Sequence, residues 1–244
     1  MKNKHQLFHK GLTATCLLLL MQSRLQRGPL DAYQASGEAA HALSRQNLRE
    51  IAQTLPRHRL FSYASQGALN DAYFELAAQS LNDGYIYLVI TSSKSAPSEL
   101  IGLFTRRTYN HVSLAFDADL CTLISYNGGE NRVSPGLNAE ALEQLIDKDG
   151  ASVMVYRLPA TYEQKRRMLE KVRLINRQGS AYNLLGLFLK IRPKQNSLFC
   201  SQFVYLMLEL VELNYFQKNA AHVTPTDFVE LDYYRKLDFI HQIA

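Results

Sequence analysis

The most constraining feature of the sequence is an abrupt change of pattern at Asn82, Asp83 and Gly84, a strong turn signal. Residues 85–91, directly after it, are β-branched or aromatic almost throughout, which suits a buried strand. Before the turn, residues 31–54 and 66–81 are rich in helix formers with apolar side chains three and four apart. The sequence therefore predicts a helical N-terminal extension over residues 1–80.

Beyond the turn, short strands and helices are mixed. Apolar alternation predicts strands at 111–116, 120–126, 152–158 and 237–243, and helical spacing predicts helices at 98–105, 138–147, 161–178, 181–190 and 199–213. Thr224 and Pro225 are typical of a further helix start. This mixture predicts an α+β domain over residues 84–244.

Composition excludes several classes of protein. With 47% hydrophobic and 20% charged residues, the chain is neither disordered nor collagen-like nor mucin-like. Its three cysteines are odd in number and widely spaced, so they predict no disulfide framework and no zinc site. A reduced compartment is therefore expected.

The net charge of +5 raises the alternative of a nucleic-acid-binding protein. Residues 1–80 hold 9 basic and 5 acidic residues, whereas residues 81–244 hold 18 and 17. Because the excess belongs to the extension, the rest of the chain is nearly neutral. We therefore expect no nucleic-acid partner.

The N-terminus combines a basic segment, residues 1–10, with an apolar run at 11–21. This pattern is typical of a signal peptide, but no small-residue cleavage site follows. The run is also too short to span a bilayer as a helix. We expect the buried stripe of a helix in a cytoplasmic protein. The alternatives are export, or membrane association in which residues 1–30 contact a membrane surface or another protein.

One cysteine has a setting that indicates chemistry. Cys200 begins the apolar helix predicted at 199–213, and a thiol at a helix N-terminus is favoured as thiolate by unpaired backbone N–H groups. A nucleophile also needs a base. His111 opens a predicted strand, from which its ring can face a helix terminus.

The segments around these two residues resemble the permuted branch of the NlpC-type papain-like hydrolases, which includes the YiiX-like and lecithin:retinol acyltransferase-like families. The resemblance is carried by residues 109–116, by 199–204 and by the Tyr-x-x-x-Gly pattern at 182–186. Residues 223–228 resemble the segment that often follows the cysteine helix. His111 precedes Cys200, which is the permuted order. The resemblance implies a papain-like fold in circularly permuted order, with an antiparallel sheet packed on the cysteine helix.

The resemblance also implies the site residues. His111 would take the proton from Cys200, and Tyr182 and Ser201 would bind substrate or stabilise the oxyanion. In the family a third residue on the next strand orients the histidine. Here the alignment places Ser125 at that position, with Asn127 two residues on and facing the same way. Serine is a weak orienter, so Asn127 or a backbone carbonyl is the expected substitute.

The resulting hypothesis is a cysteine hydrolase or acyltransferase that acts on an amide or ester bond through an acyl-enzyme. Neither metal nor cofactor is expected. The substrates suggested by the family are peptides, lipid acyl esters and small amides. The alternative is a non-catalytic binding module on the same fold, with a site degraded at Ser125.

Overall fold

The computed structural model describes residues 65–92, 109–129, 133–147, 150–183 and 196–243. By its internal contacts the chain divides into two units, Met1–Pro56 and Arg57–Ala244, and all described residues lie in the second. The helices predicted at 31–54 and 98–105, and the apolar run at 11–21, lie outside the described residues.

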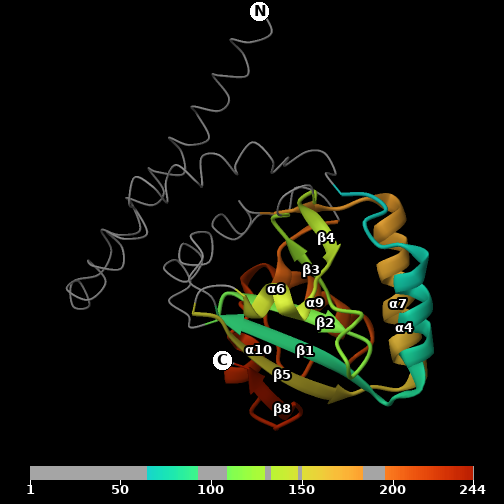
Figure 1. Cartoon of the computed structure of the whole chain (residues 1–244). Coiled ribbons are helices and arrows are strands. Elements are labelled where there is room, and N and C mark those ends of the chain that lie inside the picture. The colour runs from blue at the N-terminus through green and yellow to red at the C-terminus, as the bar shows by residue number, and fades with distance from the viewer. Residues whose placement is uncertain (1–64, 93–108, 130–132, 148–149, 184–195, 244) are drawn as a thin grey trace, which may run out of the picture. The chain divides into compact units, whose positions relative to one another are not determined.

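A six-stranded antiparallel sheet forms the centre of the domain, with strand order β4-β3-β2-β1-β5-β8 (Figure 1). The strands are β1 (Tyr85–Ser92), β2 (His111–Ala115), β3 (Ile124–Asn127), β4 (Gly136–Ala139), β5 (Ser152–Pro159) and β8 (Asp238–Ile243). Together with the helices, this sheet confirms the predicted α+β class.

Strand β1 lies inside the sheet, paired with β2 on one side and β5 on the other. Residues Ile86 to Thr91 are all buried, so both faces of the strand are covered. This explains why the segment after Gly84 is apolar without alternation. The turn before it is held by the Asp83 carboxylate, which accepts a hydrogen bond from the backbone N–H of Tyr85 at 3.0 Å.

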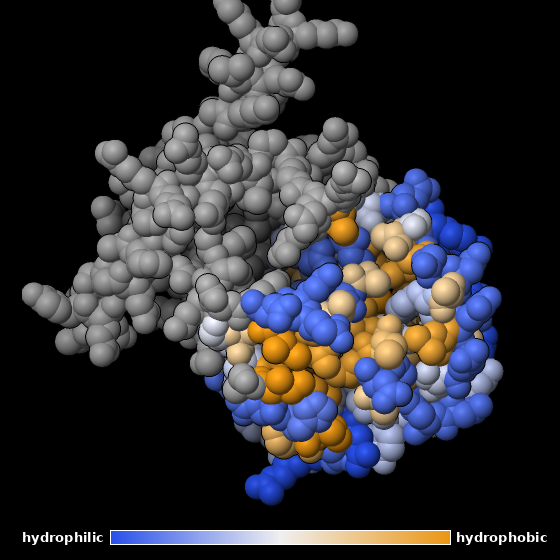
Figure 2. Space-filling model, in the orientation of Figure 1, coloured by the Kyte–Doolittle hydropathy of each residue, from blue (hydrophilic) through white to orange (hydrophobic). Residues whose placement is uncertain are grey.

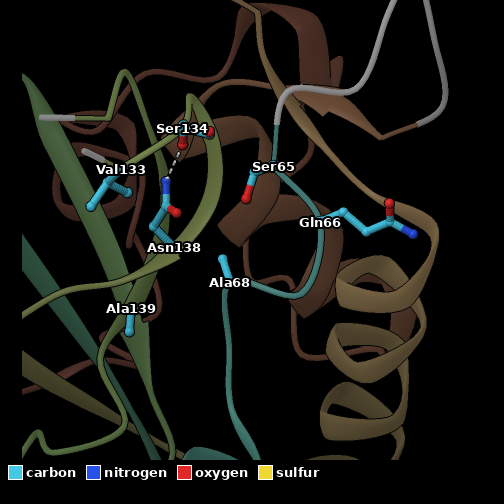
Figure 3. A pocket seen from close by; sticks show the side chains of 7 residues that line it. All are labelled: Ser65, Gln66, Ala68, Val133, Ser134, Asn138 and Ala139. Carbon is cyan, nitrogen blue, oxygen red and sulfur yellow. Dashed lines mark hydrogen bonds between the residues drawn. The ribbon is translucent and has the colours of Figure 1, made fainter. Parts of the chain in front are cut away.

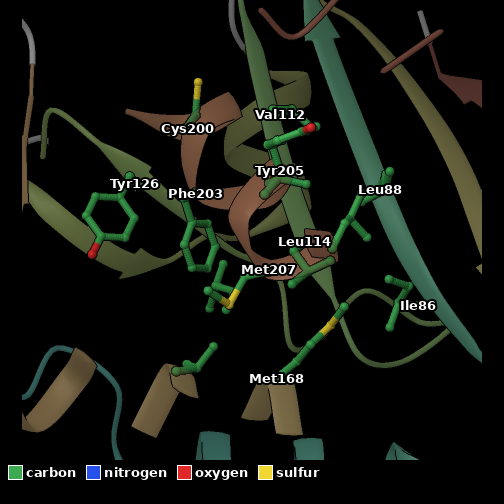
Figure 4. Packing of buried hydrophobic residues seen from close by; sticks show 14 of the residues in the cluster. Ile86, Leu88, Val112, Leu114, Tyr126, Met168, Cys200, Phe203, Tyr205 and Met207 are labelled. Atoms are coloured by element: carbon green, nitrogen blue, oxygen red, sulfur yellow. The ribbon is translucent and has the colours of Figure 1, made fainter. Parts of the chain in front are cut away.

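The main core lies on one face of the sheet. Three helices contribute to it: α4 (Asp71–Gln79), α7 (Tyr162–Gln178) and α9 (Cys200–Leu210). Figure 4 shows side chains of α7 and α9 packed together with those of β1 and β2. Helix α7 confirms the helix predicted at 161–178, and the structure shows that it begins with a reciprocal capping box between Thr161 and Gln164. A smaller cluster, with the short helix α6 (Leu142–Ile146), covers the other face.

Helix α4 belongs to the domain rather than to a separate extension. Asn70 caps its N-terminus, and its residues Tyr73, Phe74 and Ala77 are part of the main core. The compact unit also begins at Arg57. The helix predicted at 66–81 is therefore confirmed over α4 and the 3-10 turn Ser80–Asn82, but it packs with the domain that we expected to begin at residue 84.

Two helix predictions differ from the structure: the one at 138–147 is confirmed only over Leu142–Ile146, and the one at 181–190 is contradicted at Ala181–Tyr182, while its residues 184–190 lie outside the described residues. Residues Gly136–Ala139 form strand β4, because they pair with β3. Within the helix predicted at 138–147, only Leu142–Ile146 is helical. Residues Ala181–Tyr182 form β6, which pairs in parallel with β7 (Ser197–Leu198). In both places pairing with a distant strand overrides local helix propensity.

The C-terminal part consists of the short helix α10 (Asp227–Glu230) and the edge strand β8. Strand β8 confirms the strand predicted at 237–243, and its residues are exposed over nearly their whole length. Among the described residues, no helix is long and apolar enough to cross a membrane.

Candidate active site

Cys200 is the first residue of α9, as predicted, and it is a free, buried cysteine. Helix α9 packs against β2 and β3 through Phe203 and Val204, which are fully buried. Figure 4 shows the Cys200 sulfur at the end of this helix, pointing away from the packed rings. The thiol therefore lies at the end of the helix where backbone N–H groups have no partner within the helix.

His111 is the first residue of β2, two strands from the sheet edge formed by β4. The side chain of Cys200 interacts with its imidazole and raises the pKa of His111. The structure thus brings together the two residues that the sequence analysis singled out, although 88 intervening residues separate them in the chain.

Glu140 is the third member of the cluster, and the sequence analysis missed it. Its carboxylate oxygens lie 3.0 and 3.1 Å from Nε2 of His111. Since Nε2 faces the carboxylate, Nδ1 is the ring nitrogen left for the thiol. The Glu140 side chain is only 8% exposed and that of His111 20%, so solvent screens this pair weakly.

Two further side chains hold the Glu140 carboxylate in place. The Ser113 hydroxyl donates to Oε2 at 2.5 Å, and the Asn127 amide donates to Oε1 at 2.8 Å. Asn127 is held in turn by Asn138, whose amide donates to its Oδ1 at 2.9 Å. The carboxylate therefore has a fixed orientation towards His111, as a group that positions an imidazole requires.

The contact between His111 and Glu140 raises the pKa of the imidazole and lowers the pKa of the carboxyl group. Burial by itself lowers the pKa of His111, but the charge of Glu140 and the hydrogen bonds to Cys200 and Glu140 raise it to about 10. Burial by itself raises the pKa of Glu140, but the charge of His111 and the hydrogen bonds from His111, Ser113 and Asn127 lower it to about 2. At neutral pH the ring is therefore an imidazolium held beside the Glu140 carboxylate.

The reason that Glu140 escaped prediction is its place in the chain. It directly follows β4, in a segment whose Ala, Glu and Leu residues indicate a helix. Only the pairing of Asn138 with Ser125 and of Asn127 with Gly136 brings this strand beside β3. A polar residue at the end of a strand two places from the histidine strand would have been the signal.

Ser125 and Asn127, the predicted orienting residues, contact different partners. The Ser125 hydroxyl is fully buried and donates to the backbone oxygen of Val112 at 2.9 Å, so it holds β3 to β2 instead of orienting the ring. Asn127 contacts Glu140 and therefore acts on His111 through that carboxylate. We expected Asn127 to orient His111 directly, in place of Ser125. Instead, Asn127 contacts Glu140, and Glu140 contacts His111.

Tyr182 and Ser201 also differ in their positions. Tyr182 pairs with Leu198, two residues before Cys200, and is largely buried. Burial raises its pKa well above 10, and the charges of Cys200 and Glu140 raise it further, so the phenol stays neutral and can donate a hydrogen bond. The Ser201 hydroxyl instead donates to the backbone oxygen of Val223 at 2.7 Å. Its role is to hold the start of α9 against the following segment.

A pocket of about 320 Å³ lies at the outer edge of β4 (Figure 3). Its described lining residues are Ser65, Gln66, Ala68, Val133, Ser134, Asn138 and Ala139. Neither Cys200 nor His111 lines it. Its link to the cluster is indirect, through the hydrogen bond from Asn138 to Asn127, so we place the chemistry at Cys200 and not in this pocket.

Within the described ranges, no group of three or more His, Cys, Asp or Glu side chains is arranged to hold a metal ion. Cys121, which the sequence placed in a strand, is an exposed free cysteine in the turn before β3. Of the two described cysteines, Cys200 is therefore the one with a histidine beside it.

No protein-family model matches the chain, and no curated protein matches it at a significant level. Function must therefore be inferred from the side chains and their geometry.

Proposed function

We propose that the protein is a thiol-dependent hydrolase or acyltransferase that acts on an amide or ester bond through Cys200 and His111. The observation that carries this proposal is the position of the His111 ring, which interacts with the Cys200 side chain and hydrogen-bonds through Nε2 to the Glu140 carboxylate. A nucleophile, a base and a group that orients the base are the minimum set for covalent catalysis of this kind.

In the proposed reaction the Cys200 proton resides on the imidazole, and the thiolate sulfur attacks the carbonyl carbon of the substrate. The backbone N–H groups at the start of α9, together with the Tyr182 hydroxyl, stabilise the oxyanion that forms. The imidazolium then gives its proton to the departing amine or alcohol, which leaves an acyl group on the sulfur. Water or an acceptor alcohol or amine attacks this thioester, loses its proton to His111 and releases Cys200 as thiolate.

Glu140 supports both proton transfers. Its charge stabilises the imidazolium, which keeps a proton available for the leaving group at neutral pH. Its fixed geometry, set by Ser113 and Asn127, keeps the ring from rotating away from the thiol. We assign Glu140 the orienting role that the sequence analysis assigned to Ser125 or Asn127, and we class Asn127 as a positioning residue.

We further propose that the domain is a papain-like fold in circularly permuted order, of the NlpC type. Two features support this assignment. The strand that carries His111 precedes the helix that begins at Cys200, and that helix packs on an antiparallel sheet through contacts with β2 and β3. The substrate classes considered are peptides, lipid acyl esters and small amides.

The alternative function, a binding module with a degraded site, depended on Ser125 as the orienting residue. The contact between Glu140 and His111 removes that dependence and favours the catalytic proposal.

A generic activated ester tests the proposal without knowledge of the substrate. The test protein carries Cys16→Ser and Cys121→Ser, so Cys200 is its single thiol. With p-nitrophenyl acetate we expect a burst of p-nitrophenolate and one acetyl group on Cys200 by mass spectrometry. Cys200→Ala should show no burst, and His111→Ala should slow it on the order of a hundredfold or more. An equal burst from folded Cys200→Ala protein would refute the mechanism.

A further inference from the structure

The C-terminal end of the domain exposes an aromatic surface that the proposed chemistry does not use. We call it the aromatic patch and define it as Tyr233, Tyr234, Phe239 and Ile240. The side chains of Tyr233 and Tyr234 are 76% and 77% exposed, and Phe239 is 55% exposed. Four large exposed side chains within eight residues of the chain are uncommon on a monomer, and exposed apolar groups of this kind mark contact surfaces.

The two tyrosines are presented by a rigid turn. The Asp232 carboxylate accepts hydrogen bonds from the backbone N–H groups of Lys236 and Leu237 at 2.8 and 2.9 Å. The Arg235 N–H also donates to the Asp232 carbonyl oxygen, with Arg235 in the left-handed region at φ 49°. The turn is thus closed by its own first residue, so presenting the rings costs little ordering entropy on binding.

Two cations lie beside the rings. Arg235 and Lys236 are exposed and follow the tyrosines directly. The acidic groups next to them are engaged: Asp232 by the two backbone N–H groups, and Asp238 by Arg157 at 3.3 Å. Figure 2 shows strongly hydrophilic and hydrophobic side chains next to one another at the lower end of the molecule, where Figure 1 places β8.

Edge-to-edge pairing of β8 with a second copy is disfavoured. In the ladder with β5, Val155 pairs with His241 and Tyr156 with Phe239, which leaves Ile240 as a bulge without a partner. Bulges on edge strands oppose the addition of another strand. The aromatic patch therefore suits a partner that is bound through side-chain and charge contacts rather than through backbone hydrogen bonds.

We propose that the aromatic patch is a docking site for the surface of an anionic lipid membrane. Tyrosine has an apolar ring and a polar hydroxyl, a combination that is enriched at membrane interfaces. Arg235 and Lys236 would contact lipid phosphates, and Phe239 and Ile240 would rest against the acyl boundary. This inference is independent of the proposed catalytic function, because it uses none of the active-site residues.

A fluorescence experiment tests the site directly, since the chain contains no tryptophan. Tyr234→Trp in the full chain places a single reporter in the patch. With vesicles of phosphatidylcholine and phosphatidylserine in equal parts, we expect a blue shift of its emission and quenching by brominated lipid. The matched control is Tyr162→Trp on α7, where the native side chain is 50% exposed. Its emission should not shift.

Vesicle co-sedimentation gives the energetic test. Each cation near an anionic surface contributes about fivefold to partitioning, or ~1 kcal/mol, so Arg235→Asn with Lys236→Gln should weaken binding roughly 25-fold. Tyr233→Ser with Tyr234→Ser should weaken it roughly tenfold or more. The control Lys171→Gln with Arg177→Gln on α7 should leave binding unchanged.

Three outcomes would overturn the proposal. The first is vesicle binding that survives both patch variants, which would place the contact elsewhere in the chain, for example in the basic N-terminal region. The second is a blue shift of Tyr234→Trp that rises with protein concentration in the absence of lipid, which would indicate contact between copies. The third is a blue shift of the same size in Tyr234→Trp and Tyr162→Trp when the vesicles contain phosphatidylcholine alone.

Discussion

The carboxylate of Glu140 lies 3.0 Å from Nε2 of His111. Three strands cooperate in this contact: His111 opens β2, Asn127 ends β3 and Glu140 follows β4. The contact defines a charged imidazole in a weakly solvated setting, and the first predictions concern that charge.

Replacing Glu140 by Gln should lower the pKa of His111. The carboxylate holds this pKa at about 10, above the ordinary value of 6.5, and the amide has no charge to do so. An NMR titration of the ring would follow the change. Ser125→Ala is the matched control, because Ser125 contacts only backbone oxygens and its loss should leave the His111 pKa near 10. Equal pKa values in wild type and Glu140→Gln would contradict the assignment.

The same pair predicts how stability depends on pH. The raised pKa of His111 contributes stability that is complete below pH 6.5 and is lost as the pH rises through about 10. The lowered pKa of Glu140 contributes stability that is complete above pH 4.5 and is lost as the pH falls through about 2. Urea unfolding should therefore show wild type more stable than Glu140→Gln by about 1–3 kcal/mol near pH 6. The gap should close towards pH 10, and a gap that widens there would contradict the sign.

Asn127→Asp should impair the site while preserving its shape. The new carboxylate would stand 2.8 Å from Glu140 in place of an amide donor, so it should raise the pKa of Glu140 by like-charge repulsion. We expect slower iodoacetamide alkylation of Cys200 in the single-thiol background, most clearly at mildly acid pH. Asn127→Leu separates the two effects, because it removes the hydrogen bond without adding charge. If both variants react like wild type, Asn127 does not position Glu140.

Tyr182→Phe tests the oxyanion role. Removal of one donor from an oxyanion site costs on the order of a hundredfold in rate, so the p-nitrophenolate burst should slow by that order while the fold is kept. Ser201→Ala is the comparison, since its hydroxyl holds Val223. That variant should lose about 1 kcal/mol of stability without a change in burst rate. The reverse pattern would assign the oxyanion role to Ser201.

Lys165 should be a major determinant of stability. Its buried ammonium donates to the backbone oxygens of Ser80 and Phe116 at 2.6 and 2.7 Å and to the Asp83 carboxylate. Lys165→Met leaves these acceptors without their donor and should destabilise the fold by about 3 kcal/mol, measured by denaturant unfolding. Arg166→Gln, next to it but on the solvent side with Glu163 and Glu170, should leave the unfolding midpoint unchanged.

Much of the fold was predictable because its signals are local. The apolar run after Gly84 is sufficient to indicate a covered strand, and helical spacing indicates the helix at 161–178, which the structure shows as α7 (Tyr162–Gln178). Cys200 at the start of an apolar helix is also a local pattern, since it depends only on the residues that flank it.

Tertiary structure decided what lies beside His111. The segment around Glu140 has the composition of a helix, and its strand exists because β3 supplies the hydrogen-bond partners. Likewise, Ser125 was a reasonable orienting residue by position, but the sheet turns its hydroxyl to Val112. The sequence by itself indicated Cys200 and His111, the proposed nucleophile and base, and their order along the chain. Pairing of β3 with β4 decided which carboxylate lies beside His111, because register depends on partners that no local pattern encodes.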